Sequence, residues 1–252
     1  MLETFIALLT AHLLADFVFQ TNKMVANKRK LHIFLLHIFI VIVLAILLLG
    51  TLSAPLLIIL GISHLMMDMA KIAVFKNPTM GFIVDQLFHL AIIVFLAFIC
   101  PMAFSSGIWA EKFPDYINGY MITLCLISGL VTTLKVGGII IGLLTSSLKE
   151  EMEAIQKDGE EGLTKGGEYI GQLERILVMI AVLIGQPLTI GFIMTVKTFL
   201  RFNDSKQRKT AEYIMIGTFL SIAWGVVVAI ITNHGIIHFS GKECAALEFC
   251  KP

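Results

Sequence analysis

Two short stretches of this chain, AHLLADFVFQ at Ala11–Gln20 and SHLMMDMAKI at Ser63–Ile72, share the pattern His-Leu-x-x-Asp. Each stretch places a histidine and a carboxylate four residues apart inside a run that is otherwise apolar. Residues four apart lie on the same face of a helix, so each stretch predicts a polar stripe on an apolar helix. Ionisable side chains are costly inside a membrane, and the two stripes therefore constrain how the helices pack.

The composition around these stretches is typical of a polytopic membrane protein. Hydrophobic residues make up 57% of the 252 residues and charged residues 15%, against about 45–50% and about 25% in ordinary soluble domains. Apolar runs long enough to span a bilayer recur along the chain. We therefore expect the lipid bilayer as the environment, and the formal net charge of +1 gives no support for a nucleic-acid partner.

Seven apolar segments are candidate spans, and the sixth is long enough to cross twice. They are 2–21, 31–49, 55–75, 80–104, 117–144, 168–202 and 212–232. The 35 residues of 168–202 would make a helix of about 52 Å, whereas the hydrocarbon core is about 30 Å thick. Gly185-Gln186-Pro187 is typical of a turn inside this segment. The alternative is a single long helix kinked at Pro187.

Basic residues decide the orientation. NKMVANKRK, after the first span, and RFNDSKQRK, before the last, each carry four Lys or Arg residues. Short basic loops lie on the cytoplasmic side. With seven spans these two loops would fall on opposite sides, and they fall on the same side if 168–202 crosses twice. We therefore predict an all-helical transmembrane bundle with about eight crossings of a bacterial inner membrane and with the N- and C-termini outside.

An offset of 52 residues aligns the first two spans with the next two without a gap. The residues that coincide are rare ones: His12, Asp16 and His37 meet His64, Asp68 and His89. This coincidence predicts an internal duplication of a two-helix unit, with repeats at about 1–52 and 53–104. Because each unit crosses twice, the repeats should be parallel and related by a pseudo-two-fold axis along the membrane normal.

The rest of the chain is expected to divide into four parts. These are a loop with the fifth span (105–148), a charged cytoplasmic loop (149–167), C-terminal transmembrane helices (168–232) and an exposed tail (233–252). The acidic stretch 149–165 is a candidate surface for a protein partner. Cys244 and Cys250 in the tail are close enough in sequence to form a disulfide if that side is oxidising.

The His–Asp pairs are expected to share one depth in the membrane. His12/Asp16 and His64/Asp68 lie on spans that descend toward the cytoplasm, whereas Asp85/His89 has the opposite order on a span that ascends. Asp85 therefore lies with the other two aspartates toward the cytoplasm, and the histidines lie deeper. Glu174 and Arg175, near the cytoplasmic start of their span, join the same layer. We expect these groups to face one another in a cavity open to the cytoplasm.

Three functions are consistent with such a cluster. The first is a membrane-embedded hydrolase or phosphotransfer enzyme that depends on a divalent metal, zinc or manganese, and acts on a small anionic or lipid substrate at the cytoplasmic leaflet. In it, Asp85 or Glu174 handles protons, Arg175 stabilises an anionic group, and the metal ligands are His12, Asp16, His37, His64, Asp68 and His89. The second is proton- or ion-coupled transport, and the third is a structural membrane subunit with a buried polar network.

Several motifs carry a resemblance to a known family. They are HLLADFVFQT, HLMMDMAK and DQLFH in the first half, and GEYIGQLERILVMIAVLIGQ, IGFIMTVKTFLRF and EYIMIGTFLS in the second. With them the chain resembles domain-of-unknown-function family 3307 of bacterial multi-pass inner-membrane proteins. The resemblance implies a helical membrane protein and supplies no catalytic role. The His-Leu-x-x-Asp element also looks like one in membrane proteins described as metal-dependent hydrolases, without their fuller His-rich N-terminal motif.

Overall fold

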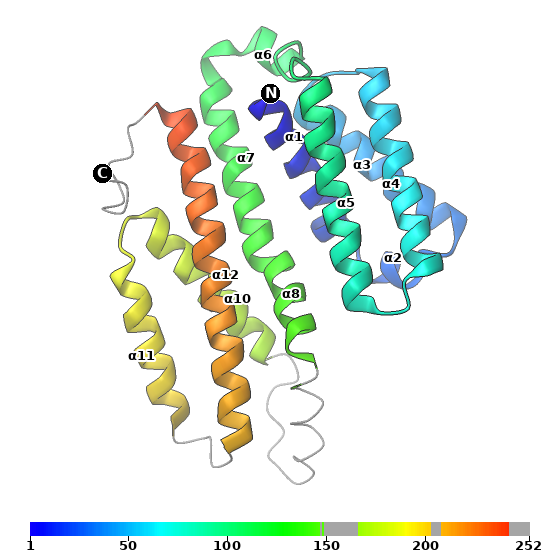
Figure 1. Ribbon diagram of the computed structural model, residues 1–252. Coiled ribbons are helices and arrows are strands. Elements are labelled where there is room, and N and C mark those ends of the chain that lie inside the picture. Colours follow the sequence, from blue (N-terminus) through cyan, green and yellow to red (C-terminus); the bar gives the residue numbers. More distant parts are fainter. Residues whose placement is uncertain (147, 149–165, 203–207, 242–252) are drawn as a thin grey trace. The chain divides into compact units, whose positions relative to one another are not determined.

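The computed structural model describes residues 1–146, 148, 166–202 and 208–241, and every regular element in these ranges is a helix (Figure 1). The predicted all-helical fold is thus confirmed. The chain divides into two compact units, Met1–Ser128 and Gly129–Pro252. Cys244, Cys250 and the acidic stretch 149–165 lie outside the described residues.

Four long helices form the core of the first unit. They are α1 (Leu2–Leu14), α3 (Leu31–Leu49), α4 (Ala54–Val74) and α5 (Pro78–Ile99). Both α1 and α4 pack against α3 and against α5, so the four helices make a closed ring. Exchanging α1 with α4 and α3 with α5 leaves this set of contacts unchanged, as a pseudo-two-fold axis requires. The internal duplication itself stays a prediction.

The first span changes its helix type where its aspartate lies. After α1 the chain continues as a π-helix, η1 (Ala15–Phe19), whereas α4 stays α-helical through Asp68. A π turn inserts one extra residue and changes the direction of the side chains that follow it, and such turns are frequent at functional sites. A short helix, α2 (Asn22–Ala26), follows, and its first turn is capped by Thr21, whose Oγ1 accepts a hydrogen bond from Met24 N.

Two glycines fix the end of α3. Gly50 ends the helix in the left-handed conformation, with φ 69°. Gly107 precedes the short helix α6 (Ile108–Lys112), and Ile108 N donates a hydrogen bond of 2.9 Å to Gly50 O. Trp109 Nε1 donates to Leu47 O at 2.7 Å. These bonds hold the segment after α5 against the end of α3.

The fifth predicted span is a single long helical segment, and the second unit begins inside it, at Gly129. Its parts are the 3-10 helix η2 (Pro114–Tyr116), α7 (Ile117–Val131), the π-helix η3 (Thr132–Val136) and α8 (Gly137–Leu144). The second unit continues with α10 (Gly166–Leu183), α11 (Leu188–Phe202) and α12 (Arg208–Ser240). Within this unit α10 packs along α12, around Met179, Val182 and Ala229.

The segment 168–202 breaks at the predicted turn. Gly185 has φ 72°, its N–H donates to Val182 O, and Gln186 N donates to Ala181 O at 2.8 Å. This pair of bonds is a Schellman motif, and Pro187 directly after it cannot continue the helix. The predicted turn is confirmed, and a single long helix kinked at Pro187 is not what the structure has.

Six helical segments of the described ranges are long and apolar enough to cross a membrane. They are Leu2–Phe19, Leu31–Leu49, Ala54–Val74, Pro78–Ile99, Pro114–Leu144 and Glu212–Ser240. Neither α10 nor α11 is among them, so the number of eight crossings stays a prediction. The two basic loops lie on the same side of the membrane if 168–202 crosses it twice. They also do so if this segment enters the membrane as a hairpin and returns to the side from which it came.

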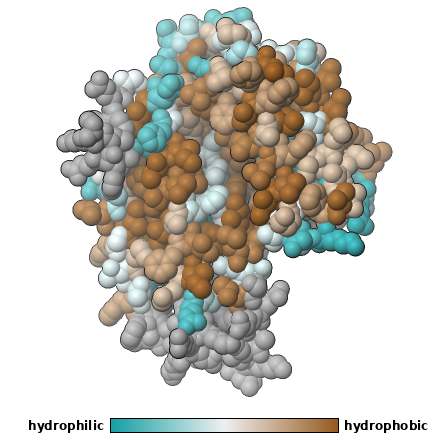
Figure 2. Space-filling view, in the orientation of Figure 1, coloured by the Kyte–Doolittle hydropathy of each residue, from teal (hydrophilic) through white to brown (hydrophobic). Residues whose placement is uncertain are grey.

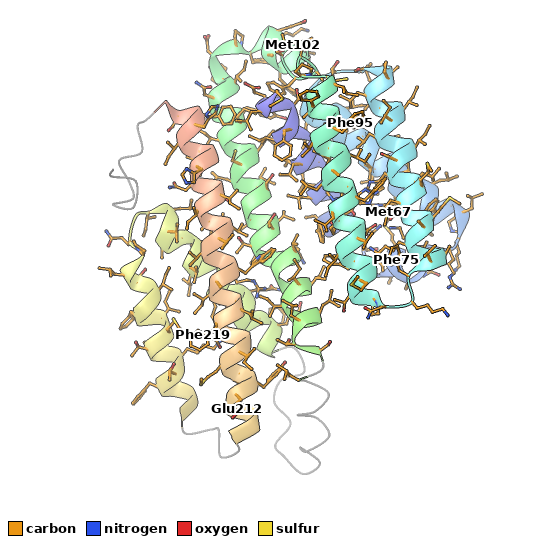
Figure 3. All side chains as sticks on the ribbon, in the orientation of Figure 1. Met67, Phe75, Phe95, Met102, Glu212 and Phe219 are labelled. Carbon is orange, nitrogen blue, oxygen red and sulfur yellow. The ribbon has the colours of Figure 1, made fainter. Side chains whose placement is uncertain are left out.

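The helices of each unit turn apolar side chains outward. Figure 2 shows hydrophobic residues over most of α4 and α5, with hydrophilic residues gathered at the turn between these two helices. Phe95 on α5 and Phe219 on α12 are 50% and 55% exposed (Figure 3). Such faces are stable against lipid, and they leave the ring interior of the first unit as the place for ionisable groups.

Residues 233–240, predicted as the start of an exposed tail, are helical in the structure, and 242–252 lie outside the described residues. The helix α12 continues through Ser240, and Gly241 ends it with φ 63°. Asn233 and Phe239 are buried within the second unit. The helix therefore continues past the polar residue Asn233, whose side chain is buried.

Gly107 provides a test of the packing at the end of α3. A Cβ added at Gly107 would lie 2.3 Å from Leu49 O, whereas one at Gly119 would meet nothing within 4 Å. We expect Gly107→Ala to reduce the free energy of unfolding by about 1–3 kcal/mol, because backbone atoms must move. The matched variant Gly119→Ala should be neutral or stabilising. Thermal unfolding in detergent micelles measures both, and equal midpoints would contradict this packing.

Candidate metal centre

A group of seven ionisable side chains lies inside the ring of α1, α3, α4 and α5, and each of these side chains is at most 7% exposed. We call this group the His/Asp cluster. It consists of His12, Asp16, His37, His64, Asp68, Asp85 and His89. The prediction that these residues converge is confirmed.

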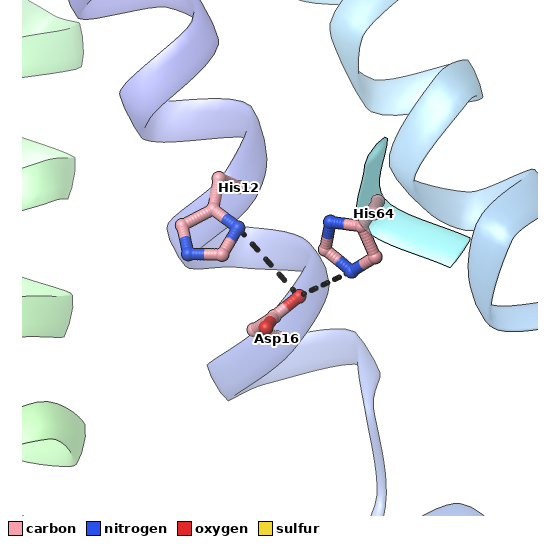
Figure 4. Close-up of side chains that lie close together, drawn as sticks. All are labelled: His12, Asp16 and His64. Carbon is pink, nitrogen blue, oxygen red and sulfur yellow. Dashed lines mark ion pairs between the residues drawn. The ribbon is translucent and has the colours of Figure 1, made fainter. Parts of the chain in front are cut away.

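Asp16 is the hub of the His/Asp cluster. Its Oδ1 lies 3.8 Å from His12 Nδ1 and 3.5 Å from His64 Nε2 (Figure 4). The same oxygen is 3.4 Å from His37 Nε2. One carboxylate oxygen therefore faces imidazole nitrogens from three helices, α1, α3 and α4.

His37, His64 and Asp68 form a second group of close contacts within the cluster. The Nε2 atoms of the two histidines are 3.0 Å apart, and Asp68 Oδ2 lies 3.6 Å from that of His37 and 3.8 Å from that of His64. Two ligand atoms bound tetrahedrally to one zinc ion at about 2.0–2.1 Å are about 3.3 Å apart. The spacing of this triad therefore suits a single divalent ion.

Asp85 and His89 complete the cluster on α5. Asp85 Oδ1 lies 3.3 Å from His89 Nε2. The imidazole of His89 stacks on that of His64 with ring centroids 4.0 Å apart. This stacking joins α5 to the groups on α4.

Two lysines neutralise part of the charge. Lys28 Nζ lies 2.6 Å from Asp68 Oδ1, and Lys71 Nζ lies 2.6 Å from Asp85 Oδ2. Three carboxylates against two ammonium groups leave one negative charge when the imidazoles are neutral. From the sequence, Lys28 counts only as a charge of the basic loop, and Lys71 is expected near the same layer but without a role. Lys71 lies three residues after Asp68, on the same helix face, and this spacing indicates that its ammonium group is close to the cluster.

Gln86 fixes the tautomer of His12. Its amide nitrogen donates to Asp85 Oδ2 at 3.1 Å, so its carbonyl oxygen is the atom that faces His12 Nε2 at 3.2 Å. An amide oxygen only accepts hydrogen bonds, so His12 Nε2 carries the proton. In the neutral imidazole, Nδ1 then carries a lone pair, and this lone pair lies opposite Asp16 Oδ1. Two acceptors therefore face each other.

Several buried polar atoms of the cluster have no hydrogen-bond partner among the described residues. They include Asp16 Oδ1, Asp68 Oδ2, Asp85 Oδ1 and His89 Nε2. Asp68 and Asp85 each bind a lysine through one carboxylate oxygen, which we call the outer oxygen. The other oxygen of each, which we call the inner oxygen, has no hydrogen-bond partner among the described residues. Buried polar atoms are nearly always satisfied, so such a concentration is where ordered water or a bound ion is expected.

Access to the cluster differs from the expectation of a cavity open to the cytoplasm. A cavity of about 10 Å³ lies against His12, His64 and His89, and it continues toward apolar residues such as Leu8 and Leu60. This volume holds about one water molecule. At the other end of the cluster, where the carboxylates lie, Lys28 and Lys71 pair with Asp68 and Asp85. The lysines lie there because the three carboxylates need positive charge close by. The side chain of Lys71 is nevertheless 33% exposed there.

Glu174 and Arg175, also predicted for the site, lie in the second unit. Glu174 Oε2 accepts a hydrogen bond of 2.7 Å from Lys197 Nζ. Arg175 donates to Thr133 O at 2.7 Å and Leu134 O at 3.3 Å, both in η3, and further to Ser221 Oγ. These contacts satisfy carbonyls of the π-helix, which favours a structural role for Arg175.

Residues 4–112 match the family model described as "Protein of unknown function (DUF3307)". This segment belongs to that family. The DUF3307 segment spans α1 to α6 and includes the whole His/Asp cluster with Lys28 and Lys71. The resemblance seen in the sequence is confirmed for these residues, and the motifs of the second half lie outside the match. No curated protein and no solved structure matches the chain.

The Lys28–Asp68 pair gives a direct test of the site's electrostatics. We expect Lys28→Met to destabilise the protein by about 3 kcal/mol, because a buried carboxylate loses its partner. Adding Asp68→Asn to Lys28→Met should restore much of this loss. Lys30→Met, at an exposed position two residues on, is the matched control. Thermal unfolding in detergent measures all four proteins, and a Lys28→Met midpoint equal to that of the control would contradict the pairing.

Proposed function

We propose that the DUF3307 segment is a divalent-metal-dependent hydrolase or phosphotransfer enzyme, embedded in the bacterial inner membrane and acting on an anionic substrate at the cytoplasmic leaflet. The termini are proposed to lie outside, as the basic loops predict. One observation carries the proposal: carboxylate oxygens and imidazole nitrogens converge inside the helix ring, and Asp16 Oδ1, Asp68 Oδ2 and Asp85 Oδ1 have no hydrogen-bond partner in the described part of the chain.

A purely structural network explains this arrangement less well. A half-satisfied polar network is less stable than an apolar core, because each unpartnered buried group retains its desolvation cost. Interhelical polar contacts in membranes contribute only about 0.6 kcal/mol each on average. A cation held with His37 and His64 would satisfy the inner oxygen of Asp68.

The donor set favours zinc or manganese. Imidazole nitrogen and carboxylate oxygen are the common ligands of both ions. We place the ion between His37, His64 and Asp68, where all three ligand atoms lie within 4.8 Å of one another. Three protein ligands leave a coordination position for water, the arrangement of catalytic zinc sites.

The proposed reaction is the hydrolysis of a phosphate ester. When bound, a divalent ion held by His37, His64 and Asp68 would lower the pKa of a water molecule at the site. Asp85 would take a proton from the attacking water as the water oxygen bonds to phosphorus, the bond from phosphorus to the leaving oxygen would break, and that oxygen would receive the proton from Asp85. In phosphotransfer an acceptor alcohol replaces the water. Lys28 and Lys71 hold the anionic phosphoryl group, the role predicted for Arg175, and Lys71 marks the point of entry.

Metal content and activity test this proposal together. We expect purified wild-type protein to contain stoichiometric zinc or manganese and to release phosphate from p-nitrophenyl phosphate or from phosphatidic acid in mixed micelles. His37→Ala should lose the metal and at least 100-fold of the activity, because it removes a ligand. His32→Ala, an exposed histidine on the same helix, should retain both. A wild-type protein without metal would rule out the enzyme.

Proton- or ion-coupled transport is the second candidate. It is favoured by the imidazoles of His12, His64 and His89, which line the small cavity, and by Asp85, which contacts both His89 and the partly exposed Lys71. Buried His and Asp side chains in series are typical of proton relays.

A pH-jump assay in liposomes tests transport separately. If the cluster conducts protons, wild-type protein accelerates pH equilibration, and the double variant Asp16→Asn/Asp68→Asn does not, because it removes the central acceptors. Asp115→Asn, at an exposed position of the same unit, is the control. Equal flux in the double variant and the wild type would exclude a relay through these residues.

A further inference from the structure

We infer that the His/Asp cluster binds two divalent cations, and that the second lies between Asp16, Asp85 and His89. This inference rests on the proposed function, which needs only the ion between His37, His64 and Asp68. It assigns the residues that the first ion leaves unused.

The cluster contains three groups of residues that could each hold an ion, and two of these groups share no residue. The first is His37, His64 and Asp68, and the second is Asp16, Asp85 and His89. In each triad the three ligand atoms lie within 4.8 Å of one another. Each also contains at least one buried carboxylate oxygen that has no hydrogen-bond partner among the residues the structure describes: Asp68 Oδ2 in the first, and Asp16 Oδ1 and Asp85 Oδ1 in the second.

Asp16 connects the two triads. Its Oδ1 lies 3.4 Å and 3.5 Å from the Nε2 atoms of His37 and His64, both ligands of the first ion. It is also grouped with Asp85 and His89 in the second triad. A carboxylate placed in this way can bridge two cations, as in two-metal sites whose ions are about 3.5–4 Å apart. The π-helix that begins at Ala15 gives this helix a geometry that α4 does not share.

Neighbouring side chains hold the second triad in place. Lys71 and Gln86 both donate to Asp85 Oδ2, so the carboxylate is fixed with Oδ1 toward His89. Hydrogen bonds of this kind orient metal ligands and tune their basicity. Gln86 also holds His12 with its Nδ1 lone pair toward Asp16. With Asp85 bound to the second ion, His12 Nδ1 becomes the proton acceptor for the bound water.

The charge of such a centre identifies its substrate as a phosphoryl anion. The cluster with its two lysines carries one negative charge, and two divalent ions change this to three positive charges. One hydroxide and one doubly charged phosphate monoester restore neutrality, which a buried site requires. A lipid phosphate and a soluble phosphate monoester share this chemistry.

Metal titration of the purified full-length protein in detergent tests the inference. We expect wild-type protein to bind two Mn²⁺ ions per chain, with an electron paramagnetic resonance spectrum that shows coupling between neighbouring ions. His89→Gln and Asp85→Asn should each bind one uncoupled ion, and His37→Gln should do the same through loss of the first site. His32→Gln and Asp115→Asn are matched controls that should retain two coupled ions.

The outcomes separate the two proposals. One ion per wild-type chain at saturating Mn²⁺, or two ions without coupling, would overturn the second site and leave the proposed function intact. No bound ion would overturn both. Two coupled ions that persist in His89→Gln and Asp85→Asn would overturn the assignment of the second triad. Phosphate release from phosphatidic acid micelles, compared with release from soluble p-nitrophenyl phosphate, shows whether the substrate is a lipid.

Discussion

Three carboxylates buried inside a ring of apolar helices are the constraint on which the first unit depends. Asp16, Asp68 and Asp85 cannot face lipid, so the helices that carry them must turn these faces toward one another. Lys28 and Lys71 supply two positive charges at one end, and four imidazoles surround the remaining lone pairs. The outward faces are then free to be apolar, which makes the unit compatible with a bilayer.

The ring and its chemistry follow from the same residues. His12, His64 and His89 come from α1, α4 and α5, and His37 from α3, so every helix of the ring contributes to the cluster. The inner carboxylate oxygens lack hydrogen-bond partners in the described part of the chain, whereas the other oxygens of Asp68 and Asp85 hold lysines. A cation centre needs both features: ligand atoms that point inward, and hydrogen-bond partners that fix the orientation of the ligands.

The sequence predicted the helices and the convergence of the cluster, because both follow from periodicity and from the cost of burying charge. It also predicted the turn at Gly185. It did not predict the π-helix at Ala15–Phe19 or the pairing of Lys28 with Asp68, because local patterns do not show where a loop folds back. The roles of Glu174 and Arg175 stay predictions, since these residues lie in the second unit and contact Lys197 and the carbonyls of η3.

The central claim is that imidazoles and carboxylates of one helix ring coordinate a metal ion. X-ray absorption at the metal edge of the purified, metal-loaded protein measures this most directly. The account predicts a first shell of nitrogen and oxygen at about 2.0–2.2 Å, with the outer-shell scattering of at least two imidazole rings. A spectrum of oxygen ligands alone, without imidazole scattering, would contradict it.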